Sequence, residues 1–387
     1  MNEEKAYAYW LTNVAGLTAK SRKSLLHMAE TYKNVYELSE KNIVLTLGKE
    51  QSQVFFKGKE CWDVRDAYEK LTSLGIQYTA RGLSDYPKRL EHIGSPPAAL
   101  YYKGRLPLHQ KPSVAIVGAR MCSEYGKLAA EEFGSKLALA GIQIISGLAV
   151  GIDGISQKAA LDVGAESFGV LGCGVDICYP KCNQLLYDRM CMQGGILSEF
   201  PPGTPPKAQH FPARNRIISG LADLVLVVEA KERSGTGITV DFALEQGRDV
   251  YAVPGRITDA LSQGCHKLIR QGAGIAATPE DILSVLYYEE KALQAGKSKY
   301  QKTGKKSVIL SLNAEERSVW DCLDELPKGL QDIHDRRKQY LEEHSDAGKM
   351  RTKSCMIQET MEVLMGLCVK GFVENENNGY RKKRDFL

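Results

Sequence analysis

The central part of the chain, about residues 112–288, alternates short apolar runs with segments of helical periodicity. Apolar or β-branched runs lie at residues 113–117, 142–145, 167–171, 195–200, 223–229 and 249–253. Helical patterns lie between them, at residues 125–140, 154–164, 214–221, 238–246 and 266–271. Strands that are apolar on both faces and separated by helices belong in a buried parallel sheet, and right-handed crossovers then place helices on both faces. The sequence therefore predicts a Rossmann-like, doubly wound α/β domain with a mostly parallel sheet.

The segments that flank this domain differ from it in composition. Residues 1–72 carry apolar positions at helical spacing and predict a small helical domain of the SAM-like or helix-hairpin-helix type. Its turn Val14–Thr18 either approaches a phosphate with backbone amides or simply connects two helices. Residues 73–111 are rich in turn residues and predict a connector packed on the central domain.

The C-terminal part follows a polar, lysine-rich stretch at residues 289–311 that has the composition of a linker. Residues 312–387 then show two helical patterns followed by two short runs separated by a turn. This order predicts a winged-helix-like domain, although the charged stretch at residues 334–353 departs from the usual pattern.

Length and composition exclude several classes of protein. The 387 residues contain no run of about 18 apolar residues, and the N-terminus is acidic, so we expect a cytoplasmic protein with no membrane partner. Ten cysteines are scattered without paired spacing, which favours reduced thiols over disulfides or a metal site. The formal net charge of +4 is too small to establish a nucleic-acid partner, so the distribution of charge must decide.

Glycine-rich turns follow the first three predicted strands of the central domain. These turns are Val117–Arg120, Ser146–Asp153 and Leu171–Asp176. Ligands of doubly wound sheets bind beyond the carboxyl ends of the strands. Glycines there let backbone amides approach a ligand, and the following helix N-termini favour anions such as phosphates. The alternative interpretation is that these glycines only make tight strand-to-helix turns.

The kind of anion is limited by the motifs that the chain lacks. There is no G-x-G-x-x-G fingerprint and no P-loop sequence, which argues against dinucleotides and against P-loop chemistry. We expect no cofactor and no catalytic nucleophile. Basic residues lie at the same positions instead, in Arg120 and in the helix start from Phe211 to Arg216.

An aromatic residue beside arginines is typical of single-strand binding, because the ring stacks on a base while the cations bind phosphates. Phe211, Arg214, Asn215 and Arg216 have this arrangement, and a polar run from Ser234 to Thr239 opens a further helix. The alternative interpretation is that the arginines form structural ion pairs with Glu199 or Glu229.

Taken together, these loops closely resemble the DNA-processing protein A family, also called Smf. The resemblance rests on ordered motifs over about residues 112–288, and it is weak over the C-terminal domain. The motifs are Val117–Arg120 with Tyr125-Gly126, Ser146–Asp153, Val170–Asp176 with Tyr179-Pro180, Leu197–Pro201, Phe211–Ile218, Val227–Ala230, Ser234-Gly235 with Ile238-Thr239, and Ala252–Gly255. The connector contributes Asp85–Leu90 and Pro96-Pro97 to Gly104.

The resemblance implies a non-enzymatic, dimeric protein that binds single-stranded DNA, protects it, and loads the RecA recombinase onto incoming strands during natural transformation. It implies that Arg120, Arg214 and Arg216 clamp the DNA backbone and that glycines keep the groove open. The full set of expected DNA-binding residues is Gly118, Arg120, Ser146, Gly147, Gly151, Gly172, Phe211, Arg214, Asn215, Arg216, Ser234, Gly235 and Thr239.

The chain departs from the family pattern at a few positions. Gln157 stands where the family usually has a histidine, Gly237 replaces an apolar residue, and Gly16-Leu-Thr replaces the commoner G-L-G. Two other hypotheses remain open at this point. A related Rossmann domain could bind or hydrolyse nucleotides with Glu199 or Glu229 as acid-base, and a structural, partner-docking protein is the third possibility. The sequence assigns neither the dimer surface nor the recombinase-binding face, nor a role for the C-terminal domain.

Overall fold

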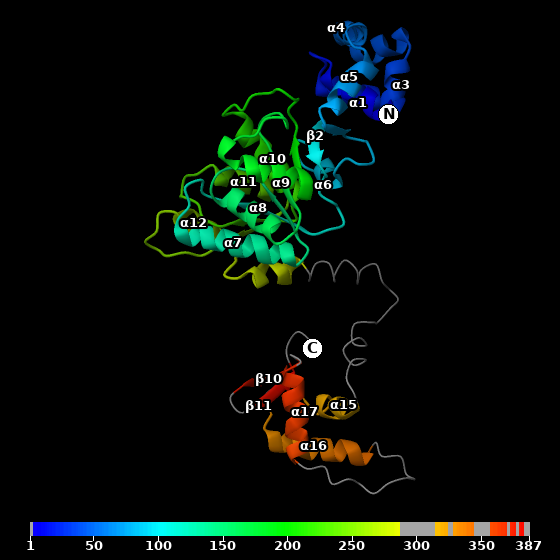
Figure 1. Cartoon of the computed structure of the whole chain (residues 1–387). Coiled ribbons are helices and arrows are strands. Elements are labelled where there is room, and N and C mark those ends of the chain that lie inside the picture. Colours follow the sequence, from blue (N-terminus) through cyan, green and yellow to red (C-terminus); the bar gives the residue numbers. More distant parts are fainter. Residues whose placement is uncertain are drawn as a thin grey trace. The chain divides into compact units, whose positions relative to one another are not determined.

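The structure is a computed structural model of the whole chain. It describes residues 3–286, 314–323, 328–343, 357–369, 372–376 and 379–382. The chain divides into two compact units, residues 1–292 and 293–387, and each is described by itself (Figure 1). The predicted lysine-rich linker at residues 289–311 lies outside the described residues.

Helices form the N-terminal part of the first unit. Trp10 and Phe55 are fully buried between them in an edge-to-face pair, and the indole of Trp10 donates a hydrogen bond to the carbonyl of Gly58. Thr18 and Asp63 accept hydrogen bonds from backbone amides in the first turns of the helices that they precede. The helices are α1 (Glu3–Asn13), α2 (Ala19–Ala29), α3 (Tyr32–Glu37), α4 (Glu40–Glu60) and α5 (Val64–Ser73).

The turn between α1 and α2 is closed by the chain itself. Gly16 adopts a φ of +83°, which a side chain would strain. The amide of Thr18, a donor that could meet a phosphate, instead donates to Oε1 of Gln51 at 3.0 Å. Nε2 of Gln51 donates back to the carbonyl of Gly16. These bonds favour the interpretation of this turn as a helix connection.

A nine-stranded sheet forms the centre of the first unit, with strand order β1-β2-β6-β5-β4-β3-β7-β8-β9. Strands β2–β6 and β1–β2 pair antiparallel, and the other neighbours pair parallel. The predicted mostly parallel, Rossmann-like sheet is therefore confirmed. The strands are β1 (Gln77–Ala80), β2 (Ala99–Gly104), β3 (Ser113–Val117), β4 (Gln143–Ser146), β5 (Ser167–Val170), β6 (Gly195–Ser198), β7 (Leu224–Val227), β8 (Asp249–Ala252) and β9 (Gly274–Ile275).

Helices cover both faces of this sheet. Alternate residues of β3 belong to different clusters: Val114 and Ile116 pack with α7 and α8, whereas Ala115 and Val117 pack with α10 and α11. This alternation is what a doubly wound fold requires. The helices of this region are α6 (Lys88–Glu91), α7 (Glu124–Leu139), α8 (Ile152–Asp162), α9 (Gln184–Gln193), α10 (His210–Leu221), α11 (Thr236–Glu245) and α12 (Gln263–Arg270).

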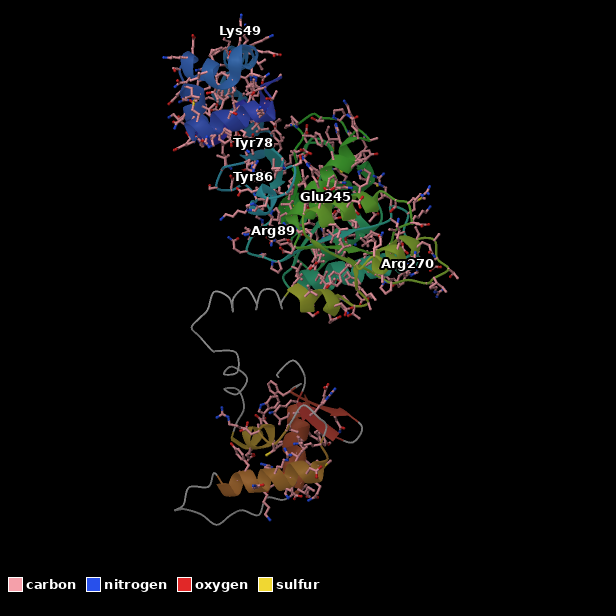
Figure 2. The ribbon with its side chains drawn as sticks, turned by 180° about the vertical axis from the view of Figure 1, so that it is seen from behind. Lys49, Tyr78, Tyr86, Arg89, Glu245 and Arg270 are labelled. Atoms are coloured by element: carbon pink, nitrogen blue, oxygen red, sulfur yellow. The ribbon has the colours of Figure 1, made fainter. Side chains whose placement is uncertain are left out.

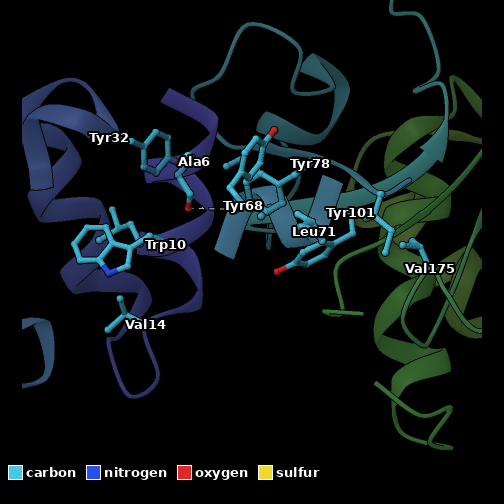
Figure 3. Close-up of a cluster of buried hydrophobic side chains, with 14 of the residues drawn as sticks. Ala6, Trp10, Val14, Tyr32, Tyr68, Leu71, Tyr78, Tyr101 and Val175 are labelled. Atoms are coloured by element: carbon cyan, nitrogen blue, oxygen red, sulfur yellow. Dashed lines mark hydrogen bonds between the residues drawn. The ribbon is translucent and has the colours of Figure 1, made fainter. Parts of the chain in front are cut away.

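The connector region adds strands β1 and β2 to the edge of the sheet. Tyr78 of β1 and Tyr101 of β2 are buried in one apolar cluster with Trp10 of the N-terminal helices (Figure 3). Farther along, Arg89 of α6, labelled in Figure 2, forms a bidentate ion pair with Asp223, which directly precedes β7. The connector is thus built into the central domain.

The second unit contains the two helices and the two-stranded hairpin that the sequence predicts, and a third helix at residues 330–343, which the sequence analysis did not predict and which overlaps the charged stretch. Its elements are α15 (Ala314–Trp320), α16 (Leu330–Glu343), α17 (Ile357–Val369), β10 (Val373–Glu376) and β11 (Gly379–Lys382). Strands β10 and β11 form an antiparallel hairpin, and Lys328 forms an isolated antiparallel bridge with Tyr380 of β11. The buried core of this unit contains Trp320, Ile333 and Leu364. Within the described ranges, no helix is long and apolar enough to span a bilayer.

Candidate nucleic-acid interface

An open cavity of about 670 Å³ lies at the carboxyl ends of the parallel strands. Its walls come from the loops after β3, β4, β5 and β7 and from the first turns of α10 and α11. It therefore occupies the position at which doubly wound sheets bind ligands. Eight of the residues expected from the sequence line it: Gly118, Arg120, Phe211, Arg214, Asn215, Ser234, Gly235 and Thr239.

Arg120 is the exposed cation of the first loop. Its guanidinium carbon lies 5.9 Å from the ring centroid of Phe211, a cation–π contact. No carboxylate lies within 4 Å of this guanidinium in the described part of the chain. Lys231, which follows β7 at the same edge of the sheet, is likewise exposed, lines the cavity and has no carboxylate that close among the described residues. Both cations are thus available to an anion.

Arg214 differs from Arg120, because it lies in the floor of the cavity and is only 4% exposed. One terminal nitrogen donates to the carbonyl of Gly147 at 2.9 Å and also to the carbonyl of Val170. Its Nε is buried and has no partner among the described residues. Burial lowers the pKa of Arg214 to about 10, so the guanidinium stays protonated at neutral pH. It therefore places a positive charge beneath the cavity, next to the carboxyl group of Asp153, which also lines the cavity.

Asp153 is the buried carboxylate beside Arg214. Burial raises the pKa of Asp153, and the positive charge of Arg214 opposes that shift. The carboxylate accepts a hydrogen bond from the amide of Gly147 at 3.1 Å. Gly147 is thus bonded to both charged groups, through its carbonyl and its amide.

The expected glycines lie where loops of the protein pack against each other. A Cβ at Gly147 would meet Arg214 at 2.6 Å and Asp153 at 2.7 Å. At Gly151, where φ is +80°, it would meet the carbonyl oxygens of Ala119 and Arg120. Gly118 and Gly172 are similarly close to Ile152 and Phe211. These close contacts explain why the fold needs glycine at these positions, as the alternative interpretation predicts. That these glycines contact DNA stays a prediction.

Arg216 and Ser146 lie outside the cavity lining. The guanidinium of Arg216 forms two hydrogen bonds with the carboxylate of Glu199, at 2.8 and 2.6 Å, and both side chains are largely buried. This is one of the ion pairs that the alternative interpretation of the arginines predicts. Ser146 is fully buried, and its hydroxyl donates to the carbonyl of Ile116. Both residues therefore lie behind the cavity wall, where they bond to other parts of the protein, and neither is part of the cavity surface.

Glu229, the other acid named by the hydrolase hypothesis, is also engaged by the protein. It is buried and accepts hydrogen bonds from the amide and the hydroxyl of Ser123, the residue that caps α7. Neither Glu229 nor Glu199 is among the residues that line the cavity. Both carboxylates thus have structural partners.

Gln157 has a structural partner on each side of its amide. Its Oε1 accepts the amide of Leu148 at 3.0 Å, and its Nε2 donates to the carbonyl of Phe168 at 2.9 Å. Leu148 adopts a φ of +55°, which is uncommon for a residue other than glycine. Gln157 therefore fixes the turn that carries Gly147 against Arg214.

Sequence reasoning missed several residues of the cavity, among them the cation Lys231 and the aromatic Tyr179. Lys231 follows β7 directly after Val228–Ala230, so the rule that ligands bind beyond strand ends could have found it. Tyr179 lies in a longer loop after β5, where no spacing rule places a side chain.

The family model described as DNA recombination-mediator protein A matches residues 77–287. DNA processing protein DprA of Streptococcus pneumoniae is 46% identical over 203 residues, which cover 51% of this chain and 70% of that protein. DprA of Bacillus subtilis is 41% identical over 232 residues, covering 58% and 78%. Protein Smf of Escherichia coli is 47% identical over 204 residues, covering 52% and 54%.

Solved structures give a similar result. The X-ray structure of DNA processing protein A from S. pneumoniae aligns with a TM-score of 0.63 at 39% identity, covering 72% of this chain and 97% of that one. DNA processing protein A from Helicobacter pylori, whose structure addresses its single-stranded DNA binding mode, aligns with a TM-score of 0.50 at 29% identity, covering 55% and 97%.

Proposed function

The chain belongs to the DNA recombination-mediator protein A family, and from this premise we propose that it binds single-stranded DNA in the cavity at the strand ends. We propose further that it acts as a homodimer in the cytoplasm, protects incoming DNA and loads the RecA recombinase onto it during natural transformation. In this role it needs no chemistry on the DNA, only positioning of an unpaired strand.

One observation carries the DNA-binding proposal: two cations without carboxylate partners in the described part of the chain, Arg120 and Lys231, line one open cavity above the buried charge of Arg214. Phosphates attract such cations regardless of base sequence. Asn215 and Ser234 line the same cavity and would donate hydrogen bonds to the strand. Arg214 would act from below, through its potential and through the loops that it holds.

The nucleotide-hydrolase hypothesis is less well supported by the same geometry. A general acid or base must reach the reacting atoms. Glu199 is paired with Arg216, and Glu229 is bonded to Ser123, outside the cavity lining. We therefore favour DNA binding.

Fluorescence anisotropy of a labelled oligothymidine, against a duplex of equal length, tests the proposal. We expect tighter binding of the single strand by the intact chain, and a marked loss in Arg120→Ala or Lys231→Ala. A parallel nucleotide-hydrolysis assay tests the rival: turnover that disappears in Glu229→Gln, without single-strand binding, would contradict the proposal.

Recombinase loading and dimerisation need separate measurements. RecA filament assembly on single strands coated with a single-strand-binding protein should be faster with the intact chain and should slow in Arg120→Ala. Light scattering coupled to gel filtration should give twice the chain mass. A monomer at micromolar concentration, or assembly rates that the protein does not change, would remove these parts of the proposal.

A further inference from the structure

Three planar side chains lie in series at the rim of the cavity. The guanidinium of Arg120 lies over the ring of Phe211, and the ring of Tyr179 lies on Phe211 with centroids 5.4 Å apart and an interplanar angle of 34°. All three residues line the cavity. They come from the loop after β3, the first turn of α10 and the loop after β5, so the fold brings them together from distant parts of the sequence.

Phe211, the residue expected to stack on a base, is enclosed by this arrangement. Arg120 and Tyr179 contact the ring, and Gly172 lies so close that a Cβ there would be 2.9 Å from a ring carbon. The side chain is half-buried. Little of the ring surface remains for a base, so Phe211 is better placed to support its two neighbours.

Tyr179 is the aromatic residue of this series that remains open. It is 44% exposed, compared with the half-buried Phe211, and it lines the cavity. Its hydroxyl has no hydrogen-bond partner among the described residues, so no polar contact of the fold explains an outward-facing tyrosine here. Large aromatic rings left partly exposed beside a cationic cavity are typical of proteins that stack on unpaired bases.

The loop that carries Tyr179 is held firmly at several points. The hydroxyl of Tyr187 donates to the carbonyl of Val175, and Nδ2 of Asn183 donates to the carbonyl of Leu148 at 2.9 Å. Cys173 is buried below the loop. A ring held in place before binding loses less conformational freedom when a base stacks on it.

We propose that Tyr179 is the base-stacking residue of this site, and that Phe211 supports it while holding Arg120 toward the phosphates. This inference rests on the proposed DNA binding and adds to it the contact that distinguishes a nucleic acid from another polyanion. Every base has a π-face, so the contact tolerates any sequence. It requires bases that are unpaired, and duplex DNA therefore cannot use it.

Paired probes test the proposal: a labelled 20-nucleotide oligothymidine and an abasic phosphodiester strand of the same length, titrated by anisotropy at one salt concentration. For Tyr179→Leu we expect affinity for oligothymidine to fall about tenfold, within the range measured for one stacked base. Affinity for the abasic strand should stay nearly unchanged, because the phosphate contacts remain. Tyr179→Phe, which keeps the ring, should bind both probes like the unsubstituted chain.

Tyr125→Leu is the matched control. Tyr125 is similarly exposed, at 47%, but its hydroxyl donates to the carbonyl of Pro254 and it does not line the cavity. We expect this variant to bind both probes normally. An equal loss on both probes in Tyr179→Leu, or no loss on either, overturns the stacking role while DNA binding stands. If the unsubstituted chain binds neither probe, the proposed function itself fails and the stacking role fails with it.

Discussion

Gly147→Ala tests whether the floor of the cavity is a fixed, charged structure. The added Cβ would lie 2.6 and 2.7 Å from two nitrogens of Arg214 and 2.7 Å from a carboxylate oxygen of Asp153. Separations below 3.0 Å force something to move. The guanidinium cannot move freely, because it is buried and bonded to the carbonyls of Gly147 and Val170.

The cost of this change follows from those contacts. Breaking one hydrogen bond to a charged group costs about 1.5–3 kcal/mol, and overpacking a close-packed site costs about 1–3 kcal/mol more. We therefore expect Gly147→Ala to lower the free energy of unfolding by about 2.5–6 kcal/mol. Because the shifted guanidinium no longer lies below the cavity as before, affinity for single-stranded DNA should also fall in the fraction that remains folded.

Urea unfolding followed by circular dichroism gives the stability, and anisotropy at low urea gives the affinity. Gly235→Ala is the matched control: this glycine lines the same cavity, its φ is not positive, and a Cβ there would meet nothing within 4 Å. We expect the free energy of unfolding of Gly235→Ala to lie within about 0.5 kcal/mol of that of the unsubstituted chain. A Gly147→Ala variant with the same urea midpoint and the same affinity would refute the fixed floor.

Three further predictions concern buried residues behind the loops that form the cavity. Arg216→Ala should lower the urea midpoint, since it leaves the largely buried carboxylate of Glu199 unpaired, while reducing DNA affinity of the folded protein less than Arg120→Ala does; a pure loss of affinity would contradict this. Gln157→Leu leaves two buried backbone groups without partners and should cost about 2–6 kcal/mol in urea unfolding, whereas unchanged unfolding would show that the turn holds without it. Burial raises the pKa of Cys173 to about 11, so its thiolate is scarce at pH 8 and forms only as the pH approaches that value; mass spectrometry of the native protein after iodoacetamide should show the exposed Cys182 alkylated well before Cys173, and equal rates would count against the burial.

The central sheet was predictable because its strands are apolar on both faces. A strand buried under helices on both faces is apolar at nearly every position, and β3 and β7 show this pattern clearly. Such strands can be recognised without knowing which strands they pair with. The connector strands β1 and β2 were not predicted as strands, because they are short and lie in a segment rich in turn residues; β1 forms the edge of the sheet and β2 lies between β1 and β6. Helix α10 begins at His210, four residues before the predicted start, since Pro212 is tolerated in a first helical turn.

The site was predictable in position more than in the role of each side chain. Glycine-rich strand ends indicated the correct edge of the sheet, and Arg120 lies there as an open cation. Arg214 and Arg216 have the same charge and nearly the same position in sequence, yet one is buried beneath the cavity and the other is paired with Glu199. Burial and ion pairing depend on contacts between distant segments, which sequence spacing does not encode. The same holds for Tyr179, which the fold brings against Phe211.

The salt dependence of single-strand binding tests the central claim most directly. Each phosphate contact releases condensed counterions, so the logarithm of the binding constant should fall linearly with the logarithm of the salt concentration, by about 0.7 per contact. We expect a steep slope for the intact chain and a slope reduced by about 0.7 in Arg120→Ala, for any base sequence. Arg105→Ala is the control. Arg105 is an exposed cation that pairs with Glu166, which directly precedes β5 and so lies at the amino ends of the parallel strands, away from the cavity. This variant should leave the slope unchanged. A flat salt response, or the same slope with and without Arg120, would contradict a phosphate-binding cavity at the strand ends.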